Sequence, residues 1–203
     1  MTTHRIEPSA SSRAHLASTM SGWRSPDGTV VTLRPTRASD AELVQQFVRE
    51  LSPEARRLRF MGAVRELTPR MLERLVRIDH TREAAVIATT SRGGRTCQLG
   101  ECRYAVCPGS DNCEFAVAVL DPWQRRGLGE RLLSELIGIA RDRGLGAMIG
   151  DVLASNAAML GLALKLGFSV SPGRGDWSMR RVSLELRPAS GSRSTGLNQS
   201  CTE

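Results

Sequence analysis

The sequence lacks the features of membrane, secreted and base-stacking proteins. Its 203 residues contain no apolar run near the roughly 18 residues that a membrane-spanning helix needs. The first residues lack the apolar core of a secretory signal, so we expect a cytoplasmic protein, with an Arg- and Ser-containing transit peptide as the alternative. Aromatic residues make up only 4% of the chain, which leaves few rings for stacking on nucleic-acid bases.

Cysteine is scarce as well, and its spacing does not match a metal site. The count is odd, and without an export signal this favours free thiols. No histidine lies near the central cysteines to complete four zinc ligands, so we expect no bound metal. We interpret these residues as small apolar side chains in strands. The five are Cys97, Cys102, Cys107, Cys113 and Cys201.

Lysine is almost absent, yet the chain is strongly basic. Of the 28 Lys and Arg residues only Lys165 is lysine, and the net charge is +7 with a pI of about 10.1. This balance favours an anionic partner, which could be a nucleic acid, an acidic protein or a phosphorylated cofactor. The shortage of aromatic residues makes nucleic acid the least favoured of the three.

The length and the polar ends predict one domain between two tails. A chain of this length buries a sizeable single core. Residues 1–27 and 188–203 are rich in Ser, Thr, Gly and other polar residues, which is typical of flexible tails. The domain is therefore expected to span residues 28–187.

Hydrophobic periodicity predicts a mixed α/β (α+β) sheet protein with the element order β-α-α-α-β-β-β-α-β-α-β. Turn residues separate the second, third and fourth strands, which are expected to form an antiparallel meander. The expected strands are 29–35, 83–90, 97–107, 113–120, 147–153 and 177–186. The expected helices are 39–51, 52–60, 67–78, 127–143 and 156–168.

A glycine-rich turn with two arginines, residues 124–129 (QRRGLG), joins the strand 113–120 to the helix 127–143. Backbone N–H groups at a helix N-terminus have no intrahelical partner, and glycines let a phosphate approach them closely. The turn therefore suits a pyrophosphate; the alternative is a plain tight turn into a core helix. It is neither a P-loop, which requires a lysine after the glycines, nor a dinucleotide fingerprint, whose third glycine is replaced by Leu132.

The whole pattern resembles the GNAT (GCN5-related N-acetyltransferase) family. Residues 124–129 match its acetyl-CoA-binding loop, Gln/Arg-x-x-Gly-x-Gly/Ala after a strand, and SNAAMLGLALKLGF is similar to its Asn…Leu-Gly-Phe helix. LSPEARRLRFMG and CEFAVAVLDPWQRRGLG look like the acetyltransferase domain of bacterial Pat-type protein lysine acetyltransferases. The resemblance covers residues 29–186 and implies a single GNAT-like acyl-CoA N-acyltransferase domain that uses acetyl-CoA.

The resemblance also implies roles for individual residues. In Pat-like enzymes a glutamate on the strand before the loop takes the proton of the attacking amine, and Glu114 occupies that position. The backbone N–H near Val117 is expected to stabilise the oxyanion. The alternatives are a solvated or ion-paired Glu114 and a plain helix N-cap at Asn156. The expected cofactor-binding residues are Val117, Ala118, Val119, Gln124, Arg125, Arg126, Gly127, Leu128, Gly129, Glu130 and Asn156.

One departure from the family concerns the general acid. Many GNAT enzymes place a tyrosine five residues before the phenylalanine of Leu-Gly-Phe, where this sequence has Ala163. Tyr104, the only tyrosine, lies in another predicted strand and is expected to be a core residue. The sequence therefore names no general acid, as in Pat-like enzymes.

The acceptor is expected to be a lysine of an acidic protein. Residues 49–82 carry nine arginines against five acids, a surface that suits an acidic partner; the alternative is a solvated helix face balanced by i,i+4 pairs. His80 and Arg59 are candidates for the pocket. The rival functions are acetylation of small amines and non-catalytic acyl-CoA binding, and the oligomeric state stays open.

Overall fold

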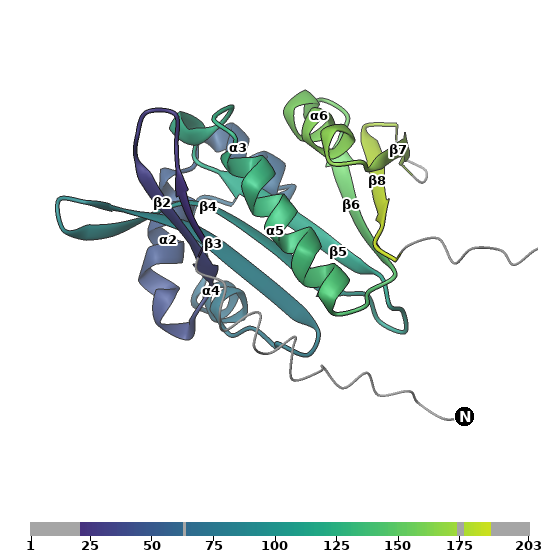
Figure 1. Cartoon of the computed structure of the whole chain (residues 1–203), viewed down its shortest axis with the longest axis horizontal. Coiled ribbons are helices and arrows are strands. Elements are labelled where there is room, and N and C mark those ends of the chain that lie inside the picture. The colour runs from purple at the N-terminus through teal and green to yellow at the C-terminus, as the bar shows by residue number, and fades with distance from the viewer. Residues whose placement is uncertain (1–20, 63, 174–176, 188–203) are drawn as a thin grey trace, which may run out of the picture.

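The computed structural model describes residues 21–62, 64–173 and 177–187, which form one eight-stranded sheet (Figure 1). The strand order is β1-β2-β3-β4-β5-β6-β8-β7, and every neighbouring pair is antiparallel except β5 and β6. The strands are β1 (Ser21–Arg24), β2 (Val30–Pro35), β3 (Glu83–Arg92), β4 (Arg95–Val106), β5 (Cys113–Val119), β6 (Ala147–Leu153), β7 (Ser169–Pro172) and β8 (Met179–Glu185).

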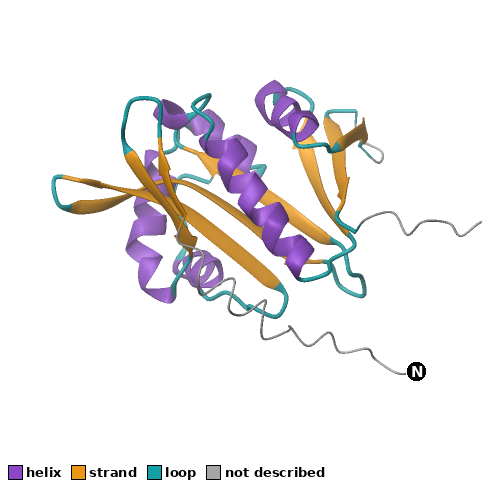
Figure 2. Cartoon of the chain, in the orientation of Figure 1, coloured by secondary structure: helices purple, strands orange, loops and turns teal. Residues whose placement is uncertain are grey.

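Helices cover both faces of the sheet (Figures 1 and 2). The long helix α5 crosses one face, whereas α2 and α4 lie on the other. The helices are α2 (Ala41–Glu50), α3 (Pro53–Phe60), α4 (Pro69–Val76), α5 (Leu128–Asp142) and α6 (Ala157–Lys165). Short 3-10 turns precede α2 (Ala38–Asp40) and follow β5 (Asp121–Trp123).

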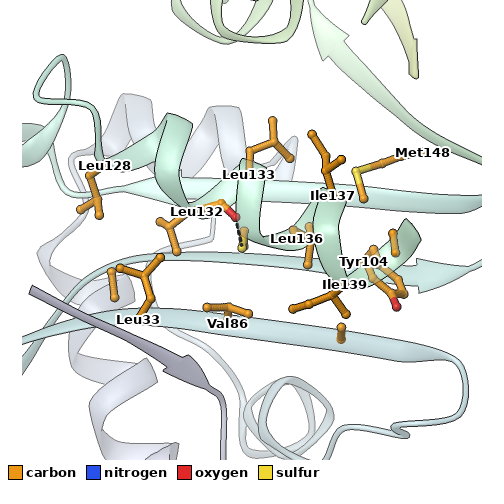
Figure 3. Close-up of a cluster of buried hydrophobic side chains, with 14 of the residues drawn as sticks. Leu33, Val86, Tyr104, Leu128, Leu132, Leu133, Leu136, Ile137, Ile139 and Met148 are labelled. Atoms are coloured by element: carbon orange, nitrogen blue, oxygen red, sulfur yellow. Dashed lines mark hydrogen bonds between the residues drawn. The ribbon is translucent and has the colours of Figure 1, made fainter. Parts of the chain in front are cut away.

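The main core lies between α5 and the centre of the sheet (Figure 3). Leu132 and Leu136 are fully buried on α5 and lie over β3 and β4. The Cys102 thiol of β4 contacts the Leu132 carbonyl oxygen at 3.2 Å. Its burial raises the pKa of Cys102 well above the ordinary range, so this thiol serves as a packing group.

Alternation along β4 sorts its side chains between the two helical layers. Cys102 and Tyr104 face α5, where the Tyr104 hydroxyl oxygen lies 2.8 Å from the Arg143 guanidinium. Glu101 and Arg103 face the opposite layer, where they contact Arg59 of α3 and the Leu75 carbonyl of α4. Each strand face therefore has its own partners, and the α3 side carries the buried charges.

The predicted mixed sheet and the β3–β4–β5 meander are confirmed, and two strands were missed. Ser21–Arg24 pairs with β2, so the predicted N-terminal tail, residues 1–27, is wrong at this strand; its four residues were too short for the alternation to stand out. Ser169–Pro172 is equally short and pairs with β8. Residues 1–20 and the predicted tail 188–203 lie outside the described residues. Within the described ranges, no helix has the length and apolar character needed to cross a bilayer.

Candidate acetyl-transfer site

Strands β5 and β6 diverge after a short parallel contact. Their register contains two pairs within the described chain, Cys113 with Met148 and Glu114 with Ile149. Beyond Glu114, β5 continues to Val119 paired with β4 alone. The rest of the β6-facing edge of β5 is therefore available to another extended group.

The ladder between β4 and β5 fixes which backbone groups face this gap. The Leu120 N–H donates to the Leu99 carbonyl at 2.9 Å, and Val119 lies opposite Gly100. In an antiparallel ladder the hydrogen-bonding direction alternates, so the N–H and C=O groups of Val117 and Val119 point away from β4. The N–H and C=O groups of Ala118 point toward β4. Of the three strand residues predicted to meet the cofactor, only Val117 and Val119 therefore direct backbone hydrogen-bonding groups into the gap.

The N-terminus of α5 lies at the end of the same strand and presents free donors. The first helical hydrogen bond joins the Arg131 N–H to the Gly127 carbonyl at 3.0 Å, and the N-cap Gly127 provides no side-chain cap. The N–H groups of Leu128, Gly129 and Glu130 therefore lack intrahelical acceptors and carry partial positive charge. Gly127 has a φ of +90°, which glycine adopts without strain.

The two arginines of the turn have different surroundings. Arg125 has a φ of +57°, an uncommon conformation for a residue with a side chain, and its side chain is exposed. Arg126 lies 2.6 Å from a carboxylate oxygen of Asp27 and 5.4 Å from the Trp123 ring centre. The hydrogen bond from Ser25, followed by those of Thr29, lowers the pKa of Asp27, so the Arg126–Asp27 pair stays ionised at neutral pH.

The remaining predicted cofactor residues lie close to this turn. The Gln124 amide donates to the Val119 carbonyl at 3.1 Å, so Gln124 occupies one of the groups facing the gap. Glu130 pairs with Lys165 of α6 at 2.5 Å. A Cβ on Gly129 would lie 3.4 Å from Leu162 of α6 and 3.8 Å from Val119. The glycine thus leaves a narrow space between the start of α5, the gap and α6.

Asn156 behaves locally as a helix N-cap. Its side-chain oxygen accepts the Met159 N–H at 3.0 Å at the start of α6. This is the alternative that the sequence left open, and it uses the oxygen alone. The amide nitrogen of Asn156 remains a donor for a group in the gap.

The face of the sheet opposite α5 carries two carboxylates beside the gap. Glu114 is exposed on the face that also bears Ala116 and Ala118, whose small side chains leave room above it. Ile149 lies opposite Glu114, so alternation along β6 places Asp151 on this face too, where it pairs with Arg181 at 2.7 Å. The sequence analysis gives no role to Asp151; the available signal was a single charged residue in the otherwise apolar strand 147–153.

The comparisons with known proteins agree with this geometry. The acetyltransferase (GNAT) family model matches residues 52–168, which is more than half of the chain. The chain is 38% identical to the acetyltransferase PA5475 of Pseudomonas aeruginosa over 142 residues, covering 70% of this chain and 76% of that protein. The chain belongs to the GNAT acetyltransferase family. It is therefore an acetyltransferase whose cosubstrate is acetyl-CoA, as the resemblance implied.

One solved structure and one further curated relative are also similar to this GNAT acetyltransferase. The GNAT domain of S. lividans PAT shares its fold with a TM-score of 0.74 over 83% of this chain and 98% of that chain, at 23% identity. The L-methionine sulfoximine/L-methionine sulfone acetyltransferase of Pseudomonas aeruginosa is 43% identical over 58 residues, or 29% of this chain and 34% of that protein. The similarity to the PAT domain agrees with the expected Pat-type fold.

Three side chains of this GNAT protein are unsuited to direct chemistry. Cys113 precedes Glu114, and burial raises the pKa of its thiol to about 12, so it is protonated at neutral pH. Tyr104 is buried against Arg143, and burial raises its pKa to about 12. Ala163, at the usual tyrosine position, is fully buried. The prediction that Tyr104 is a core residue is confirmed.

Helix α3 of the GNAT domain is fixed to the sheet at two points, one just after β5 and one on β4. The Ser52 hydroxyl donates to Asp121 at 2.8 Å, directly after β5. Arg59, which we had considered for the pocket, is 2.9 Å from Glu101 of β4, and their side chains are only 10% and 8% exposed. This pair has a structural role, because it fixes α3 over the sheet face that bears Glu114. His80, the other candidate for the pocket, is exposed.

Replacing Arg59 with Met is expected to lower the free energy of unfolding by about 3 kcal/mol, because Glu101 stays buried without its main partner. This lies at the lower end of such costs, since Arg103 remains close to Glu101. The double variant Arg59→Met/Glu101→Met should recover most of the loss in urea unfolding. Arg57→Met, which breaks an exposed pair with Glu54, is the control and should change little. An equal loss of unfolding free energy in Arg59→Met and Arg57→Met would contradict a special role of the buried pair.

Proposed function

We propose that this protein transfers the acetyl group of acetyl-CoA to the ε-amine of a protein lysine by direct attack, with Glu114 as the general base. The observation that carries the proposal is the free edge of β5 between Glu114 and the start of α5. It offers backbone donors to a thioester and helix N–H groups to a pyrophosphate along one continuous path.

Along this path the pantetheine arm pairs with the Val117 carbonyl and the Val119 N–H, because the Val119 carbonyl already accepts from Gln124, and the Val117 N–H stabilises the oxyanion. The pyrophosphate binds to the N–H groups of residues 128–130, and the exposed Arg125 adds charge. Asn156 donates its amide to the arm. No metal takes part in this scheme.

The adenosine end has a cavity beside the same helix start. A cavity of about 470 Å³ lies between the β1–β2 hairpin and α5 and adjoins Gly127. Trp23 offers a ring and Arg24 and Arg131 offer cations, a combination that suits a phosphorylated nucleoside. We assign the 3′-phosphoadenosine part of acetyl-CoA to this cavity. The strand β1 would then belong to the cofactor site.

Chemistry begins with loss of a proton from the acceptor, because a lysine ammonium with a pKa near 10.4 has no lone pair for attack. Glu114 takes this proton directly or through water. The amine nitrogen then bonds to the thioester carbon, and the oxyanion forms. The nitrogen gives up its second proton, the oxyanion collapses and the C–S bond breaks, and the CoA thiolate leaves and takes up that proton to become the thiol. Since Cys113 is protonated and buried, an acetyl-cysteine intermediate at this position is disfavoured.

Two alternatives follow from specific observations. One relative is named as an acetyltransferase of L-methionine sulfoximine and L-methionine sulfone, so a free amino acid is the rival acceptor. A non-catalytic acyl-CoA-binding module is the second, although the exposed Glu114 beside the gap favours an enzyme. Lys165 is the only lysine of the chain, so acetylation of an added protein is easily separated from self-acetylation by mass.

The deciding experiment combines calorimetry with measurement of CoA release. We expect micromolar binding of acetyl-CoA and turnover with lysine peptides. Acetyl-dephospho-CoA should bind about tenfold more weakly than acetyl-CoA, because it lacks the phosphate assigned to the cavity that Arg24 and Arg131 line. Arg131→Gln should reduce this difference, whereas Arg141→Gln, an exposed arginine further along α5, should keep it. Absence of acetyl-CoA binding would reject the function, and an unchanged difference in Arg131→Gln would reject only the assigned cavity.

A further inference from the structure

A second cavity of about 670 Å³ lies on the Glu114 side of the gap. One wall is α3 and the segment after it, and the other is the end of β6 with the start of β8. Leu153 and Met179 face each other across the β6–β8 ladder, on the face shared by Asp151 and Glu114. The cavity therefore opens on the face opposite α5. Glu114 is not one of its lining residues, and its partner on β6, Ile149, lies four residues before Leu153.

The lining combines apolar groups with cations. Met61, Leu153 and Met179 supply apolar surface, and Arg56, Arg57 and Arg65 supply positive charge. None of the described residues that line it is Asp or Glu. A volume of this size accommodates a side chain with part of its neighbours.

The charge of these arginines is only partly compensated. Arg57 is held by Glu54 at 2.8 Å, which offsets its charge. Arg56 donates to the carbonyls of Val48 and Arg49 at 3.4 and 3.1 Å, and neutral carbonyls leave its charge in place. Arg65 is exposed, and no ion pair or hydrogen bond of its side chain is found among the described residues.

Three of the six other arginines of the same segment form ion pairs. Arg49 contacts Glu66, Arg59 contacts Glu101 and Arg77 contacts Glu73. The arginine surplus that the sequence shows between residues 49 and 82 therefore includes many ordinary ion pairs. What remains uncompensated lies in part at this cavity, on Arg56 and Arg65.

We propose that this cavity is the acceptor subsite and that it selects an amine whose own structure carries a carboxylate close to the acceptor nitrogen. The proposal rests on the acetyl transfer proposed above. Positive charge without a lining acid disfavours polyamines and other polycations. A carboxylate placed against Arg56 and Arg65 orients the amine toward Glu114. The carboxylate has two chemical sources: an acidic residue beside a lysine, or the α-carboxylate of a free amino acid.

The test compares matched acceptors with wild-type protein at low salt. One pair is a lysine peptide flanked by Glu and the same peptide flanked by Gln; the other is a free amino acid and its amide. We expect kcat/KM to be about tenfold higher for the carboxylate member of at least one pair, and the ratio to fall with added salt. The pair that shows the preference identifies the source of the carboxylate.

Arg65→Glu should reduce this ratio to one or below, because a negative charge then faces the carboxylate of the acceptor. Arg70→Glu is the matched control, an equal charge change at an exposed arginine outside the cavity, and should keep the wild-type ratio. Turnover without any preference in wild type, or equal loss in both variants, would overturn the inference and leave acetyl transfer intact. Failure of wild type to bind acetyl-CoA would overturn the transfer itself.

Discussion

The Glu114→Gln variant is expected to lose turnover by a factor on the order of 10²–10³, while its affinity for acetyl-CoA stays at the wild-type value. Glutamine keeps the size and the exposed position on β5 but cannot accept the proton of the acceptor ammonium. Raising the pH should restore part of the rate, because a larger fraction of the acceptor is then already neutral. The measurement is CoA release at saturating acetyl-CoA across a pH series, with binding by calorimetry.

The structure supplies a control residue for this prediction and a second candidate for the general base. Glu185→Gln makes the same change at an exposed strand residue of β8 and should retain full activity. Asp151 lies on the same face as Glu114, so Asp151→Asn tests the other carboxylate. Full activity in Glu114→Gln together with loss in Asp151→Asn would transfer the role of base to Asp151.

The Gly129→Glu variant is expected to weaken acetyl-CoA binding by at least about 100-fold, roughly 2.7 kcal/mol. Its side chain would enter the narrow space toward Leu162 and Val119 and place a negative charge where the pyrophosphate binds. A carboxylate in the first turn of a helix is favourable in itself, so α5 should remain folded. Calorimetry measures the affinity, and thermal unfolding without ligand checks the fold.

Two further variants distinguish a blocked acetyl-CoA site from a general effect of the substitution on helix α5. Gly129→Ala should bind acetyl-CoA with little change, because the added Cβ meets its neighbours at ordinary contact distances of 3.4 and 3.8 Å. Gly138→Glu introduces the same charge on the same helix, where a Cβ meets no atom within 4 Å. Binding by Gly129→Glu that equals binding by Gly138→Glu would remove the α5 N-terminus from the cofactor site.

The element order was predictable because each long element carries its own periodic pattern. Helix α5 shows this clearly: its buried leucines recur at helical spacing, and the prediction of residues 127–143 differs by one residue at each end from Leu128–Asp142. The meander β3–β4–β5 followed from turn residues between alternating strands. Strands β1 and β7, of four residues each, gave no comparable signal, since pairing with β2 and β8 rather than local sequence specifies them.

The candidate site also combines features that the sequence predicts with features that it does not. The sequence alone determined the family, the phosphate-suited turn at residues 124–129 and the position of Glu114 on the strand before it, because these depend on residues close together in the chain. Tertiary structure decided the rest. The divergence of β5 from β6 after Glu114, the approach of α6 to Gly129, the carboxylate of Asp151 on the Glu114 face and the cavity beneath α3 each join distant segments. Their positions follow from the register of the sheet and the packing of helices on it, which no local pattern records.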